Sequence, residues 1–302
     1  MKKLIPTVAS LGMLACIACN KEHSVSNAQL IIKFRFDSTQ VRLNNVGQPS
    51  VIPSGRAAQH PIFSKMSAHY IELAPTAFTP LGGGKVLYRA LETGIGGSTA
   101  IDFQKASFAR DNEVFFSMPL KDVKPGKYEW LRISLAYQNA HVKFKVDTII
   151  NGFPIQGEYT GTLAGFIGFN TYITNFTINR ESVTVNANRK QGFWGFETVI
   201  SGPGFSVPVV STGQAPPGAT TVVNPIFSTS PIPPGSCVVT AAFVPGKLNI
   251  IGNETKDIII EASFSTNKSF EWEEIVHDGK WEPGKGEKVV DMGIRGMVPK
   301  IK

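Results

Sequence analysis

The chain has 302 residues, of which 42% are hydrophobic and 18% charged, and its formal net charge is +7. This composition supports a large core and excludes a disordered chain. Because the net positive charge is small and spread along the chain, it argues against nucleic-acid binding, which needs a basic face. The length suits one large domain or two smaller ones. The 29 glycines, the 20 prolines and the 20 phenylalanines favour strands and turns over helices.

The first 18 residues are typical of a secretion signal. Two lysines follow the initial methionine, and the apolar run from Leu4 to Ala18 is too short to anchor the chain across a bilayer. The run ends in Ala15-Cys16-Ile17-Ala18-Cys19, and polar residues follow at once. This stretch resembles the lipobox of bacterial lipoproteins, in which a cysteine receives diacylglycerol before the signal peptide is removed.

The lipobox resemblance implies that residues 1–18 are removed and that Cys19 is the lipid attachment site. It further implies an outer-membrane lipoprotein held to the membrane by its lipid anchor, at the cell surface or on the periplasmic face. Cleavage after Ala18 as an ordinary secretory signal is the alternative. Of the three cysteines, Cys16 would leave with the signal peptide and Cys19 would carry the lipid, so Cys237 would have no disulfide partner. Its apolar, strand-like surroundings predict a buried, inert thiol.

Residues 19–28 are polar and predict a tether between the lipid and the fold. Beyond it, apolar and polar residues alternate with the period of half-buried strands. We expect such strands at 30–36, 69–73, 86–91, 114–118 and 128–137, and a loop at 38–66. The glycine runs at 82–84 and 94–97 predict turns, because neither has the spacing of a phosphate-binding loop.

The alternation changes phase near Gln138. Apolar residues occupy odd positions from Leu131 to Tyr137 and even positions from Val142 to Val146. We interpret this change as two strands joined by a hairpin at Gln138-Asn139. The first of the two strands is apolar on both faces, which predicts a central position in a sheet.

Residues 202–235 contain eight of the 20 prolines. Proline cannot donate to a sheet ladder or continue a helix, so this segment is expected to be a linker or a surface loop. Strand patterns resume after it. The sequence therefore predicts an all-β fold, an antiparallel β-sandwich with long Gly/Pro-rich loops. Residues 29–302 form a single domain with an insertion at 202–235, or else two β domains, 29–201 and 236–302.

Motifs of hydrolytic enzymes are missing from the sequence after residue 18. It contains no Gly-x-Ser-x-Gly, His-Glu-x-x-His or Cys-x-x-Cys pattern. We therefore expect a non-catalytic protein that binds a ligand or partner and needs no cofactor. An envelope hydrolase with a spatially assembled site and a purely structural envelope component are the alternatives.

Two sets of residues are candidates for binding. Carboxylates and an imidazole crowd together at Glu273, Glu274, His277 and Asp278, where they could ligate a divalent metal or simply form a solvated strand end. Tryptophans that are exposed would offer stacking surfaces to the rings of a glycan, whereas core packing is the other reading of such residues. The candidates are Trp194, Trp272 and Trp281. A glycan, a metal and a protein partner all remain open as ligands.

Four stretches resemble the MbnP-like family of periplasmic and surface proteins. They are residues 30–36, 67–73, 126–132 and 191–194. The resemblance implies a β-sandwich outside the cytoplasm, in a family of which some members are associated with copper handling. The family's metal-associated residues match no positions in this sequence, so the resemblance implies no copper site here.

Overall fold

The computed structural model describes residues 27–77, 79–80, 82–150, 152–202, 204–215 and 237–302. The fold is all-β, as the sequence predicts, and the described helices are single 3-10 turns. None of the described helices is long and apolar enough to cross a membrane. The strands are β1 (Gln29–Asp37), β2 (Arg56–Gln59), β3 (Ile62–Ala74), β4 (Lys85–Arg89), β5 (Glu92–Thr93), β6 (Ala100–Asp102), β7 (Val114–Pro119), β8 (Gly126–Tyr128), β9 (Trp130–Ile150), β10 (Phe153–Phe166), β11 (Asn170–Thr177), β12 (Ser182–Lys190), β13 (Phe193–Gly202), β14 (Phe205–Gln214), β15 (Cys237–Ala242), β16 (Leu248–Ile250), β17 (Ile258–Ser265), β18 (Phe270–Glu273), β19 (Val289–Asp291) and β20 (Met297–Ile301). The 3-10 turns are η1 (Phe103–Lys105), η2 (Leu120–Asp122) and η4 (Pro283–Lys285).

The principal sheet is built around β9. Its strand order is β14-β13-β10-β9-β3-β4, and β15 also pairs with β9. Strand β3 follows one edge of β9, while the other edge pairs first with β15 and then with β10. Because β9 has partners on both edges, the central position predicted from its two apolar faces is confirmed.

The hairpin predicted at Gln138-Asn139 is wrong. Strand β9 runs without a break through these residues, and its hairpin partner is β10, with Ile150 opposite Phe153. The phase change comes from a bulge instead. Tyr137 pairs with Ser67 and Leu135 with Ala68, so Ala136 has no counterpart on β3. One extra residue moves all following side chains to the opposite face, and this produces the same sequence pattern as a turn.

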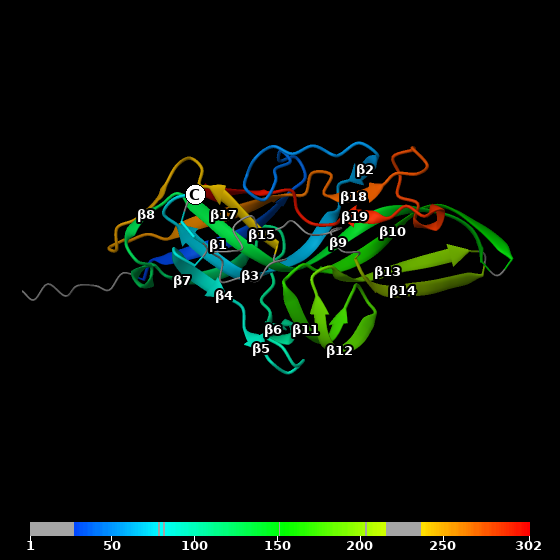
Figure 1. Cartoon of the computed structure of the whole chain (residues 1–302), viewed down its shortest axis with the longest axis horizontal. Coiled ribbons are helices and arrows are strands. Elements are labelled where there is room, and N and C mark those ends of the chain that lie inside the picture. The colour runs from blue at the N-terminus through cyan, green and yellow to red at the C-terminus, as the bar shows by residue number, and fades with distance from the viewer. Residues whose placement is uncertain (1–26, 78, 81, 151, 203, 216–236) are drawn as a thin grey trace, which may run out of the picture.

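Smaller sheets cover the principal sheet. The sheet β20-β17-β1-β7 shares a hydrophobic core with β3, β9 and β15. Two further sheets cover opposite faces of β10. Leu163 packs beneath β18, and the next residue, Ala164, packs against β11, so these neighbours point to opposite sides of the strand. In Figure 1 the strands β2, β18 and β19 accordingly lie above the principal sheet, and β6, β11 and β12 lie below it.

Two expected loops contain strands. Residues 38–66 include β2 and the start of β3, and β2 pairs with β18 over only four residues. Within 202–235, residues 205–214 form β14, which lies at the edge of the sheet and pairs, among the described strands, with β13 alone. Its Pro208 is compatible with this position, since an edge strand does not need every backbone N–H. Residues 216–236 lie outside the described residues.

Residues after 236 belong to the same sheets as residues before 202. Strand β15 pairs with β9, and β17 lies parallel to β1 from Leu30–Ile258 to Asp37–Ser265. A division into 29–201 and 236–302 would therefore separate strands that pair with one another. Cys237 pairs through its backbone with Leu135; its side chain lies outside the described residues.

Glu197 on β13 fixes the turn between β11 and β12. Glu197 is 3% exposed, and its carboxylate accepts hydrogen bonds from the backbone N–H groups of Asn179, Arg180 and Glu181 at 2.8–3.0 Å. Burial raises the pKa of Glu197, but these hydrogen bonds outweigh burial, so the pKa lies below its ordinary value.

We expect Glu197→Gln to lower the free energy of unfolding at pH 7 by about 1–3 kcal/mol, because a neutral amide oxygen accepts these bonds more weakly than a carboxylate does. The stabilisation from the lowered pKa is present above the unfolded pKa of about 4.3 and is lost as the pH falls through the folded value. Urea unfolding of both proteins between acidic and neutral pH checks this. A difference that stays constant down to the acidic end would contradict it.

Candidate functional site

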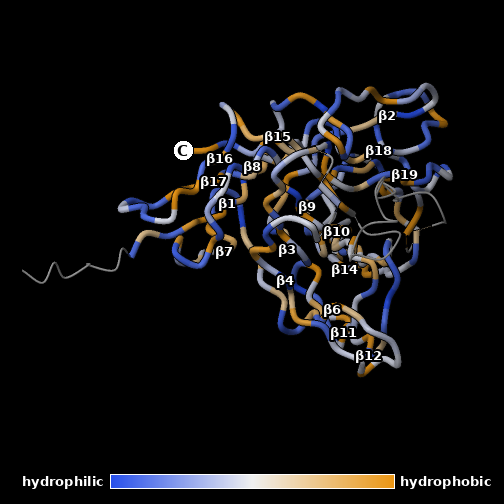
Figure 2. The backbone as a smooth tube through the Cα atoms, turned by 60° about the vertical axis from the view of Figure 1, so that its left-hand side comes forward, coloured by the Kyte–Doolittle hydropathy of each residue, from blue (hydrophilic) through white to orange (hydrophobic). Residues whose placement is uncertain are grey.

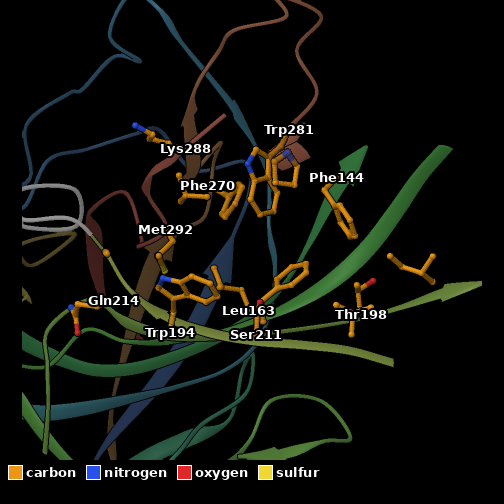
Figure 3. Close-up of a pocket in the computed structure, with 16 residues that line it drawn as sticks. Phe144, Leu163, Trp194, Thr198, Ser211, Gln214, Phe270, Trp281, Lys288 and Met292 are labelled. Atoms are coloured by element: carbon orange, nitrogen blue, oxygen red, sulfur yellow. The ribbon is translucent and has the colours of Figure 1, made fainter. Parts of the chain in front are cut away.

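A cavity of about 480 Å³ lies between strands β9, β10, β13 and β14 and the chain around residues 270–292. Figure 3 shows side chains from both sides converging on it. The lining residues are mainly aromatic or aliphatic: Phe144, Leu163, Trp194, Phe196, Thr198, Ile200, Val209, Ser211, Gln214, Ala215, Phe270, Trp281, Pro283, Lys288, Val289 and Met292. We call it the aromatic cavity.

The floor of the aromatic cavity follows from strand periodicity. Alternate residues of β13, from Trp194 to Ile200, point to one face of the sheet, as do Val209 and Ser211 on β14. The register places Phe196 opposite Ser211 and Thr198 opposite Val209. Two neighbouring strands therefore present one continuous surface to a ligand.

Glycines let the floor aromatics lie flat against the sheet. A Cβ atom on Gly213 would sit 2.5 Å from the indole of Trp194, and one on Gly161 would sit 2.2 Å from the ring of Phe196. Only glycine leaves room for these rings at such close range. The sequence Gly192-Phe193-Trp194-Gly195-Phe196 thus positions cavity residues on one face, while Phe193 packs into the core on the other face.

The roof is an aromatic cluster centred on Trp281. Its ring lies 4.9 Å from that of Phe270 and 6.1 Å from those of Phe144 and Phe196, all in edge-on arrangements. Edge-to-face pairs at such distances are stabilising beyond the area that they bury. The cluster connects the roof to the floor through Phe196.

Trp281 is held by the loop that carries it. The buried carboxylate of Glu287 accepts the backbone N–H groups of Ile275, Val276 and Glu282, and the indole Nε1 of Trp281 donates to the Glu287 carbonyl at 3.3 Å. The backbone N–H of Lys145 donates to the carbonyl of Trp281 at 2.8 Å, which ties this loop to β9.

The four residues predicted as metal ligands, Glu273 at the end of β18 and Glu274, His277 and Asp278 in this loop, do not converge. Glu274 accepts the N–H of Gly279, and Asp278 pairs with Lys145 at 3.0 Å, which lowers the pKa of Asp278. Glu273 is exposed, and the exposed His277 ring lies 3.8 Å from Glu274. Among the described residues no group of three or more His, Cys, Asp or Glu side chains is arranged to hold a metal. Their contacts shape the loop, and this geometry gives the metal prediction no support.

The three candidate tryptophans lie in different environments. Trp194 and Trp281 line the aromatic cavity, and both are partly exposed. Trp272 is 0% exposed and packs with Phe270 and Met292 in the core beneath β18. It presents no free face on which a sugar ring could stack.

Sequence reasoning missed most of the cavity. Phe196 follows the glycine–aromatic motif directly, and that motif could have indicated it. Phe144, Phe270 and Met292 carry no such signal, because they come from elements far apart in the chain and alternate like ordinary core residues. The fold alone brings them together.

The chemistry of the lining is simple. Thr198, Ser211 and Gln214 are the uncharged polar members, and Lys288 is the charged one. Of the lining residues that the structure describes, none is His, Cys, Asp or Glu. The lining thus offers apolar contact and shape, with few groups for hydrogen bonding and one fixed positive charge.

Comparisons of the chain with models of known protein families, with curated proteins and with solved structures found no match. The resemblances to a lipobox and to the MbnP-like family stay predictions from the sequence.

Proposed function

We propose that this protein is a lipid-anchored, non-catalytic binding protein of the bacterial cell envelope that holds a small apolar ligand in the aromatic cavity. The observation that carries the proposal is the cavity itself, about 480 Å³ in volume with a mainly aromatic and aliphatic lining. Ligand sites of proteins are typically about 300–1,000 Å³, mostly apolar, with few polar groups.

Burial of apolar surface supports a ligand at this position. The cavity opens to solvent, and the rings of Trp194, Phe196 and Trp281 that line it are all partly exposed. An apolar ligand would cover these rings and gain about 25 cal/mol for each Å² of apolar surface that it removes from water.

The lining favours an apolar molecule over a glycan. A sugar brings many hydroxyl groups that need hydrogen-bond partners, and burying them without partners costs free energy. Thr198, Ser211, Gln214 and Lys288 are the polar lining residues, too few for such a ligand. Trp194 and Trp281 then act as apolar walls.

The position of the cavity suits an anchored protein. Strands β1 and β7 lie on one side of the molecule, and β14, β18 and β19 lie towards the other in both views (Figures 1 and 2). Strand β1 begins at Gln29, directly after the proposed tether in the sequence. The aromatic cavity therefore lies at the end of the described fold remote from the start of β1.

The cavity is tested with two adjacent residues of β14. Val209 lines the cavity, whereas Val210 points to the opposite face, and the two are 39% and 41% exposed. We expect hexadecanol, below its solubility limit, to change the tryptophan fluorescence of residues 20–302 saturably. Val209→Trp should weaken this binding at least about tenfold, or about 1.4 kcal/mol, by filling the cavity, and Val210→Trp should leave it unchanged.

Absence of saturable binding to the parent chain would contradict the proposal, and so would equal binding by the two variants. Because each variant adds a tryptophan, the titration is repeated by isothermal calorimetry, which does not depend on fluorescence.

The anchor is tested by cysteine substitution in the full chain. We expect Cys19→Ala to release the protein from the membrane fraction, because the diacylglycerol then has no thiol to join and several acyl chains are lost together. Cys16→Ala is the matched control and should remain membrane-bound. Immunoblotting of membrane and soluble fractions measures both, and retention of Cys19→Ala in the membrane would refute the anchor.

A further inference from the structure

We infer that the ligand of the aromatic cavity is a single-chain anionic amphiphile, an acyl chain ending in a carboxylate, whose head is paired with Lys288. This inference rests on the proposed function and specifies its ligand. Among the described residues of the lining Lys288 is the charged one, and none of them carries a carboxylate. An anionic head thus meets one attractive charge there and no carboxylate that would repel it.

Lys288 has no carboxylate partner among the described residues. Two other lysines at this end of the protein do have carboxylate partners: Lys145 pairs with Asp278 and Glu282 at 3.0 and 2.9 Å, and Lys143 pairs with Glu158 at 3.0 Å. The ammonium group of Lys288 is therefore free to pair with a ligand. A charge-assisted hydrogen bond to a carboxylate is stronger than one between neutral groups.

The cavity has a polar side and an apolar side, as an amphiphile has a polar head and an apolar chain. Figure 3 shows Lys288 and Gln214 towards one side of the cavity, Trp194 next to Gln214, and Phe144 and Thr198 on the opposite side. The Gln214 amide donates to the carbonyl of Gln191 at 2.6 Å and carries no charge, so the Lys288 ammonium is the charged donor on this side. An acyl chain would extend from Lys288 across the aromatic rings.

We expect the protein to bind a ligand with a negatively charged head group more tightly than a ligand with a neutral one. Residues 20–302, which contain every described element, are titrated by calorimetry with hexadecanoate and with hexadecanol below their aggregation limits. We expect hexadecanoate to bind about tenfold more tightly, equivalent to about 1.4 kcal/mol. Lys288→Ala should remove this preference, so that the variant binds the acid and the alcohol with equal affinity, and Lys288→Arg should keep the preference.

Lys280→Ala is the matched control, because Lys280 is exposed in the same loop and does not line the cavity. It should retain the preference, which should weaken as ionic strength rises. Equal affinity of the parent chain for acid and alcohol would overturn this inference and leave the proposed function standing. An undiminished preference in Lys288→Ala would also overturn it. Failure of both compounds to bind would overturn both proposals.

Discussion

Replacing Glu271 with alanine is expected to cost about 3–5 kcal/mol of stability, because it leaves the buried Arg42 without a carboxylate partner and takes one of two carboxylates away from the buried Arg295. The side chain of Glu271 is 2% exposed and forms ion pairs with Arg42 at 2.5 Å, with Arg295, and with Arg56 at 3.6 Å. Arg42 and Arg295 are each only 11% exposed.

This network also joins segments distant in sequence. The Arg42 guanidinium donates to the backbone carbonyls of Asn267 and Lys268, and Arg295 pairs with Asp291 at 2.9 Å. Loss of Glu271 therefore loosens the chain around β18 and β19, which form part of the cavity roof. A chain of this size should lose about 2–4 °C in melting temperature for each kcal/mol.

The control for Glu271 is Glu158→Ala on β10. Its pair with Lys143 is exposed, with side-chain exposures of 41% and 68%, and such pairs contribute at most about 1 kcal/mol. Urea unfolding of both variants measures the contrast. Similar small losses in the two would show that the Glu271 network contributes no more than a surface ion pair.

Trp272→Ala is expected to lower the free energy of unfolding by about 3–5 kcal/mol, since it opens a large void in a fully buried cluster. The Trp272 side chain is 0% exposed, and its Nε1 has no hydrogen-bond partner among the described residues. Trp272→Phe should cost less, because it retains most of the ring and removes an unsatisfied donor.

Trp194→Ala tests whether Trp194 acts in ligand binding while Trp272 acts in core packing. Trp194 is partly exposed and lines the cavity, so we expect a smaller loss of stability than for Trp272→Ala and a larger loss of hexadecanol affinity than for Trp272→Phe. Chemical unfolding and calorimetric titration measure the two effects. The division into core and cavity tryptophans would be contradicted if Trp194→Ala were the more destabilising change and left binding intact.

Local patterning was enough to predict the fold class and many strands. The period of two in residues 30–36 and 114–118 corresponds to β1 and β7. It failed where one pattern has two structural causes: the phase change near Gln138 is produced by the bulge at Ala136 rather than by a turn. It also failed at β2, whose four residues show too short an alternation to distinguish from a loop.

The candidate site was only partly predictable. Residue type identified Trp194 and Trp281, but it identified Trp272 equally, because exposure depends on what the rest of the chain places over a side chain. The acidic residues near Asp278 drew attention as ligands, whereas their contacts are with loop amides and Lys145. No sequence pattern indicated Lys288, because its proposed role depends on the apolar side chains that the fold places around it.

The central claim is that the aromatic cavity holds a small apolar ligand, and analysis of co-purifying compounds tests it most directly. Residues 20–302 would be recovered from the envelope of the original host and examined by native mass spectrometry, followed by organic extraction. We expect a stoichiometric apolar compound on the parent chain and on Val210→Trp, and its loss from Val209→Trp. A bare parent chain, or the same compound on both variants, would contradict the account.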